Sequence, residues 1–370
     1  MPPRPHLALP TPGSRRAVVV GAGSFGTATA VLLARGGFRT TLQTRTREQA
    51  ARLDGDRENT RYLEGVELPR DLRIEPASEG LARADYVFLG VPSRGLQEVI
   101  RGLPEAGLGR KTPVISLAKG LVAPDGTAPT VLLAAALGSA RVACVGGPAH
   151  AHEMVTEGAG LVAASLDERL AEMIASVFMR AGVVCERSSD PIGVELAGVA
   201  KNAAALAAGA TEAVGLNAAG AAAGHIFQEV WRYAERQGAR PESMIGLAGT
   251  GDLVGTALAP QSRNRRAGEL LAKGVPTEEI PDRIGQAVEA LDVVPLLAQA
   301  LDRAGVEAPV TDALRRLIAG ELPLEAWVAQ VRATVPPPAR FGPRGAGRRA
   351  WERTRAWVRR RTRQRSTLRT

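Results

Sequence analysis

The chain has 370 residues with 45% hydrophobic content, which is enough to bury the cores of two ordinary domains and excludes an intrinsically disordered protein. Its net charge of +9 resides at the C-terminus: residues 336–370 contain twelve arginines and one acid, a local charge of +11, so the rest of the chain carries 9 − 11 = −2. The nearly neutral body therefore gives no electrostatic reason to expect nucleic-acid binding.

The N-terminus and the cysteines bear on the compartment. Residues 1–14 lack the apolar core of a secretory signal, and we expect them to form a disordered lead-in. Two cysteines, Cys144 and Cys185, cannot build a disulfide framework, which fits a reducing, cytoplasmic compartment, and we expect both to be buried. No uninterrupted apolar stretch approaches the ~18 residues of a membrane span, so a soluble protein is expected.

Short apolar runs alternate with helical stretches over the first half of the chain. The first run, residues 17–20, leads through a glycine turn into a predicted helix at 28–35, and its continuous apolarity indicates a buried parallel strand. Further runs of strand length occur at residues 40–42, 86–91, 113–117, 141–145, 160–164 and 183–185. This alternation is typical of βαβ units.

The pattern changes after Asp190. Residues 190–335 consist of long segments rich in Ala, Leu and Glu, separated by Pro and Gly breaks, which predicts an all-α domain. From residue 336 onward, Pro, Gly and Arg replace the apolar periodicity. Residues 336–370 are therefore predicted to be a proline-rich linker followed by a basic, disordered tail.

The glycine turn after the first strand is the motif GAGSFG at residues 21–26. In a strand–turn–helix context, GxGxxG allows a tight turn, a close approach of pyrophosphate to the backbone, and close packing of helix against strand. A tight turn in an unrelated α/β protein is the alternative. We favour a dinucleotide site, and with it an α/β fold in which residues 15–189 form a Rossmann-type parallel-sheet domain.

The end of the second predicted strand bears on the choice of cofactor. An acid usually accepts hydrogen bonds from the ribose of NAD there, but this chain has Gln-Thr-Arg-Thr-Arg at residues 43–47. Arg45 and Arg47 suit a 2′-phosphate, so we prefer NADP over NAD, although both arginines would also be ordinary in a solvated loop.

Two lysines are candidates for chemistry. Lys119 follows the fifth predicted strand, at the sheet edge where open parallel sheets bind ligands, although an exposed turn lysine would look the same. Lys201 lies in the apolar helical segment GVELAGVAKN at residues 193–202. Burial and a second nearby cation would both lower the pKa of its amine, so that it could exchange a proton with a substrate oxygen.

Polar residues in the helical half complete the candidate site. Asp252, between turn glycines, can hold a lysine or a substrate hydroxyl, while Arg263 and Asn264 offer planar donors for phosphate oxygens. A solvated helix start is the alternative for the arginine. His150, His152 and His225 lack the spacing and the acid or thiol partners of a metal site, so no metal is expected.

In order and spacing, the motifs GAGSFGTA, VPS, AKG, GVELAGVAKN, GLAGTGDL and QSRNRR resemble the bacterial NAD(P)-dependent glycerol-3-phosphate dehydrogenases, from about residue 17 to 335. The resemblance implies reversible, NAD(P)H-dependent reduction of dihydroxyacetone phosphate to sn-glycerol 3-phosphate, which supplies glycerophospholipid synthesis, in a homodimer. Lys201 matches the general acid/base. The matches to substrate contacts are Lys119, Gly147, Ala149, Asp252, Ser262, Arg263 and Asn264. The matches to cofactor contacts are Gly21, Gly23, Ser24, Phe25, Gly26, Arg45, Lys119, Ala151, Arg263, Ala287 and Glu289.

The chain departs from this family pattern in two places. Ala149 replaces a serine or threonine, which removes a hydroxyl expected at the substrate. Ala219, Gly224 and His225 replace basic and threonine positions, so one flank of the site is less polar. The reaction class survives both changes.

Two other functions stay open. The chain could be a related reductase of another small hydroxy or keto compound, without a need for phosphate on the substrate. It could also be a weakly active paralogue whose tail, with Trp351 and Trp357 among arginines, makes a weak contact with an anionic membrane surface or with nucleic acid.

Overall fold

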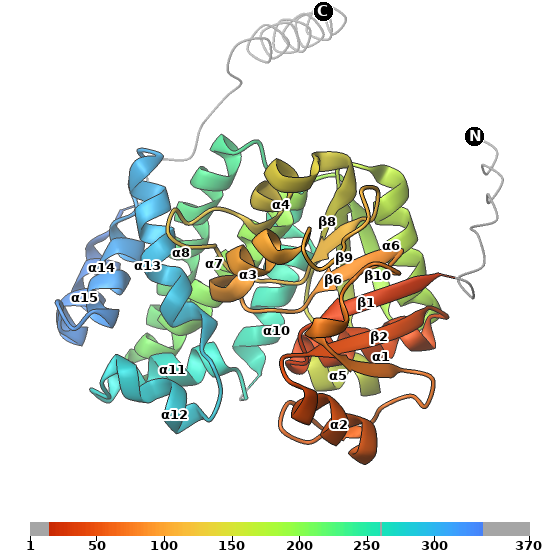
Figure 1. Cartoon of the computed structure of the whole chain (residues 1–370). Coiled ribbons are helices and arrows are strands. Elements are labelled where there is room, and N and C mark those ends of the chain that lie inside the picture. The colour runs from red at the N-terminus through yellow and green to blue at the C-terminus, as the bar shows by residue number, and fades with distance from the viewer. Residues whose placement is uncertain (1–14, 260, 336–370) are drawn as a thin grey trace, which may run out of the picture. The chain divides into compact units, whose positions relative to one another are not determined.

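An eight-stranded sheet occupies the N-terminal half of the protein, and helices make up the C-terminal half (Figure 1). The computed structural model describes residues 15–259 and 261–335; the predicted lead-in and tail lie outside the described residues. The predicted α/β fold with a helical second half is confirmed. Residues 15–334 belong to one structural unit, so the domain boundary at 189/190 stays a prediction.

The sheet has the strand order β10-β9-β8-β7-β6-β1-β2-β5. Its strands are β1 Arg16–Val20, β2 Arg39–Thr44, β5 Arg73–Pro76, β6 Tyr86–Leu89, β7 Val114–Ser116, β8 Val142–Gly146, β9 Gly160–Ser165 and β10 Val184–Ser188. All neighbouring strands are parallel except β8 and β9, which are antiparallel. A small hairpin of β3 Glu58–Asn59 and β4 Leu63–Glu67 stands apart.

Alternate residues of the strands face two different layers of helices, as the twofold side-chain period of a strand requires. Ala17 and Val19 of β1 join the hydrophobic cluster of α1 and α6, whereas Val18 faces the cluster of α3 and α4. The helices of this half are α1 Ser24–Arg35, α2 Arg47–Asp56, α3 Ser93–Gly102, α4 Pro129–Leu137, α5 Ala151–Thr156 and α6 Glu168–Arg180. The sheet is therefore covered on both faces.

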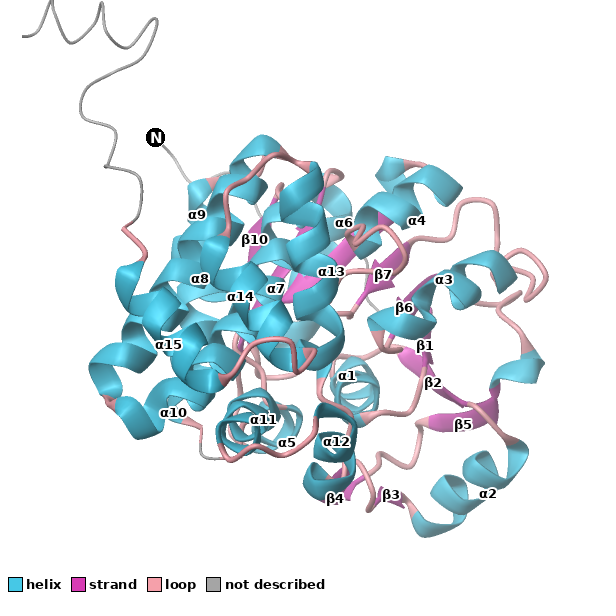
Figure 2. Cartoon of the chain, turned by 90° about the vertical axis from the view of Figure 1, so that its left-hand side faces the viewer, coloured by secondary structure: helices cyan, strands magenta, loops and turns pink. Residues whose placement is uncertain are grey.

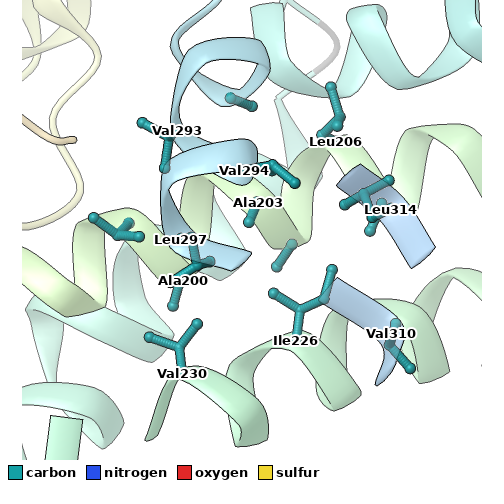
Figure 3. Packing of buried hydrophobic residues seen from close by; sticks show 14 of the residues in the cluster. Ala200, Ala203, Leu206, Ile226, Val230, Val293, Val294, Leu297, Val310 and Leu314 are labelled. Atoms are coloured by element: carbon teal, nitrogen blue, oxygen red, sulfur yellow. The ribbon is translucent and has the colours of Figure 1, made fainter. Parts of the chain in front are cut away.

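The C-terminal half of the described chain consists of helices, which are cyan in Figure 2. Its helices are α7 Pro191–Thr211, α8 Leu216–Arg236, α9 Pro241–Ile245, α10 Asp252–Leu258, α11 Arg263–Ala272, α12 Ile280–Ile284, α13 Glu289–Arg303, α14 Pro309–Ile318 and α15 Leu324–Ala333. Figure 3 shows how side chains of α7, α8, α13 and α14, among them Ala203, Ile226 and Leu297, meet in one core.

Helix α7, which packs against α8 and α11, carries Lys201. Asp190 caps its N-terminus by accepting from the Gly193 N–H at 2.8 Å, and Pro191 follows at the first helical position. Helix α11 lies against it at backbone contact, since a Cβ added to Gly209 would come within 2.1 Å of the Arg265 carbonyl oxygen. This close approach brings the start of α11 to the lysine-bearing helix.

Both cysteines are buried and unpaired, as expected, and burial raises the pKa of Cys185 to about 12. No helix among the described residues is both long and apolar enough to cross a membrane. Nor does any group of three His, Cys, Asp or Glu side chains gather in the described part of the chain in a way that would hold a metal ion.

Glu195 on α7 ties this helix to the sheet domain and should make stability depend on pH. Both carboxyl oxygens accept from the Thr130 N–H at 3.0 and 3.1 Å, and burial raises the pKa to about 8. Because the folded pKa exceeds the unfolded value of about 4.3, this group stabilises most below pH 4.3 and its contribution is lost as the pH rises toward 8.

We therefore expect the free energy of unfolding, measured by urea denaturation, to fall between pH 5 and 8, and Glu195→Gln to flatten that fall because its amide does not ionise. The glutamine keeps an oxygen that can accept from Thr130. Parallel pH profiles for the two proteins would contradict the assignment.

Candidate active site

The GAGSFG turn between β1 and α1 has the geometry of a dinucleotide cradle. Gly21 adopts φ +106°, and a Cβ there would lie 2.7 Å from the Gly90 carbonyl oxygen. A Cβ on Gly26 would lie 2.1 Å from the Gly21 carbonyl oxygen, so helix and turn touch through their backbones. A Cβ on Gly23, in contrast, meets nothing within 4 Å. The first and third glycines are needed for packing, while the second borders open space.

The N-terminus of α1 is suited to binding an anion. Gly23 is its N-cap and provides no side-chain hydrogen bond, and no acid occupies the first turn, which begins with Ser24 and Phe25. The N–H groups of a helix start and the positive end of the helix dipole favour phosphate oxygens. The residues present therefore fit the pyrophosphate of a dinucleotide.

The two arginines after β2 differ in their surroundings. The guanidinium of Arg47 lies 3.6 Å from Glu79, whereas that of exposed Arg45 has no ion-pair partner among the described residues. Within residues 15–259 and 261–335, the hydrogen bond found for Arg45 is from its backbone N–H to Gln49 Oε1. Arg45 is therefore the freer of the two to bind a ligand.

The two candidate lysines meet at one buried carboxylate. Lys119 Nζ lies 3.0 Å from Asp252 Oδ2, and Lys201 Nζ lies 3.6 Å from Asp252 Oδ1. Lys119 Nζ also donates to the Gly147 carbonyl oxygen at 2.9 Å. Lys201 comes from α7, Asp252 from the start of α10 and Lys119 from the loop after β7, so elements from both halves of the chain form this cluster.

Burial governs the charges in this cluster. Lys201 is 8% exposed and Asp252 is 3% exposed. Burial, with a further contribution from the charge of Lys119, lowers the pKa of Lys201 against the opposing attraction of Asp252. Burial alone would raise the pKa of Asp252, but the two lysines outweigh it and hold that pKa below its ordinary value. The result is a carboxylate beside an amine that loses its proton more readily than usual.

An amide network holds the loop of Lys119 against the helical half. Asn202 Nδ2 donates to the Lys119 carbonyl oxygen at 2.9 Å and to Glu289 Oε2 at 3.1 Å. Asn264 Nδ2 donates to Asn202 Oδ1 at 2.8 Å, and the Ala290 N–H donates to Asn264 Oδ1 at 3.2 Å. Sequence reasoning placed no role on Asn202, although it directly follows Lys201 in the GVELAGVAKN segment.

The remaining candidates fall into two places. Arg263 is exposed and donates to Gln286 Oε1 at 3.2 Å and to the Ala287 carbonyl oxygen at 3.1 Å, so the structure brings Arg263 and Ala287 together. Ser262 is buried and caps α11 by accepting from the Arg265 N–H.

On the sheet side, the Phe25 ring centroid lies 5.3 Å from Lys119 Nζ, and Ala149 and Ala151 pack on the same hydrophobic cluster as Phe25.

A glycine cradle at the carboxyl end of β1 and a buried lysine–aspartate–lysine cluster, one lysine of which lies 5.3 Å from the Phe25 ring of that cradle, are typical of a dinucleotide-dependent oxidoreductase. Family models agree with this class: the N-terminal model of NAD-dependent glycerol-3-phosphate dehydrogenase matches residues 16–171, and the C-terminal model matches residues 190–329. The chain belongs to this family.

Individual relatives support the assignment. A glycerol-3-phosphate dehydrogenase [NAD(P)+] of Deinococcus radiodurans is 41% identical over 310 residues, which cover 82% of this chain and 90% of the relative. One from Chlorobium phaeobacteroides is 35% identical over 315 residues, covering 83% and 94%. Among solved structures, glycerol-3-phosphate dehydrogenase from Coxiella burnetii superposes with a TM-score of 0.81 at 29% identity, covering 86% of this chain and 99% of that one.

Proposed function

We propose that the protein reduces dihydroxyacetone phosphate to sn-glycerol 3-phosphate with NADPH or NADH, and catalyses the reverse reaction. Membership in the family, whose named relatives are glycerol-3-phosphate dehydrogenases using NAD or NADP, supports this activity. The observation that carries the proposal is the placement of two lysines on one buried carboxylate beside the cofactor cradle. Such an activity supplies the backbone for phospholipid synthesis.

A nicotinamide dinucleotide held at the GAGSFG turn, residues 21–26, would supply or accept the hydride. Lys201 supplies the proton that the reduced ketone oxygen requires, since its lowered pKa makes the protonated amine a stronger acid than an ordinary lysine. Lys119 places a second positive charge beside the developing alkoxide, in a site where little water screens it. Asp252 keeps both amines in position through its two carboxylate oxygens, and in the reverse direction Lys201 accepts the proton from the alcohol.

Arg263 and Asn264 are proposed to bind the phosphate of the substrate from the start of α11. We expect Arg263→Ala to raise KM for dihydroxyacetone phosphate by about tenfold or more, because a charge-assisted hydrogen bond contributes roughly 1.5–3 kcal/mol. Arg266→Ala is the matched control, since Arg266 is an exposed arginine of the same helix. Steady-state kinetics with varied substrate measure the change, and an unaltered KM in the Arg263 variant would favour a reductase of an unphosphorylated compound.

Arg45 is proposed to bind the 2′-phosphate of NADP, which would give NADPH preference over NADH. We expect Arg45→Ala to raise KM for NADPH by about tenfold and to leave KM for NADH nearly unchanged, since only NADPH carries that phosphate. Arg47→Ala, in which the removed guanidinium already pairs with Glu79, should alter neither value much. Equal effects of Arg45→Ala on both cofactors would contradict the proposed preference.

A homodimer in the cytoplasm is proposed from the family resemblance, and the two free, buried thiols support a reducing compartment. The proposed contact of the tail with an anionic surface concerns residues outside the described part of the chain.

A further inference from the structure

The loop that carries Lys119 is closed on itself by backbone hydrogen bonds. It spans residues 117–128, between β7 and α4. The Val122 N–H donates to the Thr127 carbonyl oxygen at 2.9 Å, and the Thr127 N–H donates to the Val122 carbonyl oxygen at 3.1 Å. Lys119 lies three residues before Val122, and Thr130 lies three residues after Thr127. A displacement at Thr130 is therefore passed through this paired segment to Lys119.

One face of α7 holds both ends of this loop. Glu195, Gly198 and Asn202 are spaced i, i+3 and i+7, so they lie on the same side of the helix. At the near end, Asn202 Nδ2 donates to the Lys119 carbonyl oxygen at 2.9 Å, and a Cβ added to Gly198 would lie 3.7 Å from the Lys119 Cβ. At the far end, Glu195 accepts from the Thr130 N–H and from the Thr130 hydroxyl.

The contacts of Glu195 are made in the protein interior, next to the catalytic cluster. Glu195 and Thr130 are each 4% exposed. A cavity of about 10 Å³, room for about one water molecule, is lined by Glu195, Gly198, Lys119 and Asp252 among others. Loss of the Glu195 acceptor would leave the Thr130 N–H unpaired in the interior unless the start of α4 moved. Such a movement would begin at the wall of the space that Lys119 and Asp252 border.

We infer that Glu195 is a positioning residue for Lys119: it holds Thr130 against α7 and thereby fixes the loop that keeps the Lys119 amine on Asp252. This inference rests on the proposed function, in which Lys119 faces the developing alkoxide of the substrate. A shift of about 1 Å in a group that acts on the reacting atoms can cost about 10²-fold in rate. Glu195 thus supports turnover without touching the substrate.

A second buried glutamate provides the matched control. Glu229 of α8 is 2% exposed and accepts from the N–H groups of Val310 and Thr311 at 3.0 and 2.9 Å, and from the Thr311 hydroxyl. These contacts hold the start of α14, which like α4 begins with a proline. Helix α14 carries none of the candidate site residues. Glu229 therefore has the same helix-anchoring chemistry as Glu195 without a link to Lys119.

The test compares Glu195→Leu with Glu229→Leu. Both substitutions leave buried N–H groups without an acceptor, so thermal unfolding should show a similar loss of stability for both. At a temperature where both variants remain folded, we expect kcat for reduction of dihydroxyacetone phosphate to be about 10- to 100-fold lower in Glu195→Leu and within about twofold of the wild type in Glu229→Leu. Glu195→Gln, whose amide oxygen still accepts from Thr130, should recover most of the loss.

A double-mutant cycle with Lys119→Met shows whether Glu195 acts through Lys119. In the Lys119→Met background, Glu195→Leu should lower kcat by less than about twofold, because the amine that it positions is already absent. If either leucine variant does not fold, Thr130→Val and Thr311→Val, which each remove one hydroxyl donor, replace the pair. The expected fall in kcat is then about threefold, in Thr130→Val alone.

Two results would overturn the inference and leave the proposed function intact: an equal loss of kcat in the Glu195 and Glu229 variants, or the same effect of Glu195→Leu with and without Lys119. A Lys119→Met enzyme with the kcat of the wild type would overturn the role proposed for Lys119, and this inference with it. A wild type inactive on dihydroxyacetone phosphate would overturn the proposed function itself.

Discussion

Replacement of Lys201 by methionine is expected to lower kcat for reduction of dihydroxyacetone phosphate by about 10²- to 10⁴-fold, because the substrate oxygen loses its positioned proton donor. Methionine preserves the length and most of the volume of the side chain in this buried place. Lys119 continues to pair with Asp252 in the variant, so no buried carboxylate is left without a partner. The measurement is the initial rate at saturating substrate and cofactor.

The pH dependence separates proton transfer from simple damage. In the wild type, kcat for reduction should fall and kcat for oxidation should rise as the pH increases through the pKa of Lys201, which burial sets below its ordinary value. In the methionine variant, neither kcat for reduction nor kcat for oxidation should show this pH dependence. Fluorescence titration should show that the variant binds the cofactor normally. A kcat within tenfold of the wild type, or an unchanged pH profile, would mean that another group transfers the proton.

The second large effect is expected from substitutions of Gly23 and Gly26 in the GAGSFG motif, which should differ in their effect on stability. Gly26→Ala should destabilise the protein by about 1–3 kcal/mol or more, because the added methyl group overlaps the Gly21 carbonyl oxygen at 2.1 Å and forces turn and helix apart. Gly23→Ala should leave stability close to that of the wild type, since its methyl group enters open space. Thermal unfolding without cofactor measures both.

The Gly23→Ala variant is expected to be stable but to bind the cofactor much more weakly than the wild type. Because pyrophosphate must approach the backbone at Gly23, the methyl group of Gly23→Ala occupies the space it needs, and we expect Kd for NADPH to rise by tenfold or more. If the Gly23→Ala variant binds NADPH as tightly as the wild type, the dinucleotide does not bind at this turn. A Gly26 variant of normal stability would show that the packing described here is not needed.

Sequence reasoning located the strands of the buried sheet because apolar runs such as that of β1 are long enough to be recognised. It missed β4 and β5, whose residues are largely polar and partly exposed, so no apolar run marks them. It also did not predict that β9 runs antiparallel to β8. A strand has the same apolar pattern in either direction, and here the direction depends on the path of the chain through α5.

Within the site, residue types revealed the chemistry but not the pairings. Lys201 in an apolar helix and Asp252 between glycines could each be recognised as a candidate. Their pairing depends on the packing of α7 against α10. Arg45 and Arg47 could not be distinguished from the residue pattern alone, since only the fold places Glu79 beside Arg47.

The most direct test is to mix the purified full-length protein with dihydroxyacetone phosphate and either NADPH or NADH, and to follow the absorbance of the reduced nicotinamide. We expect loss of absorbance matched mole for mole by formation of glycerol 3-phosphate, faster with NADPH than with NADH. No consumption of either cofactor above the protein-free rate would contradict it.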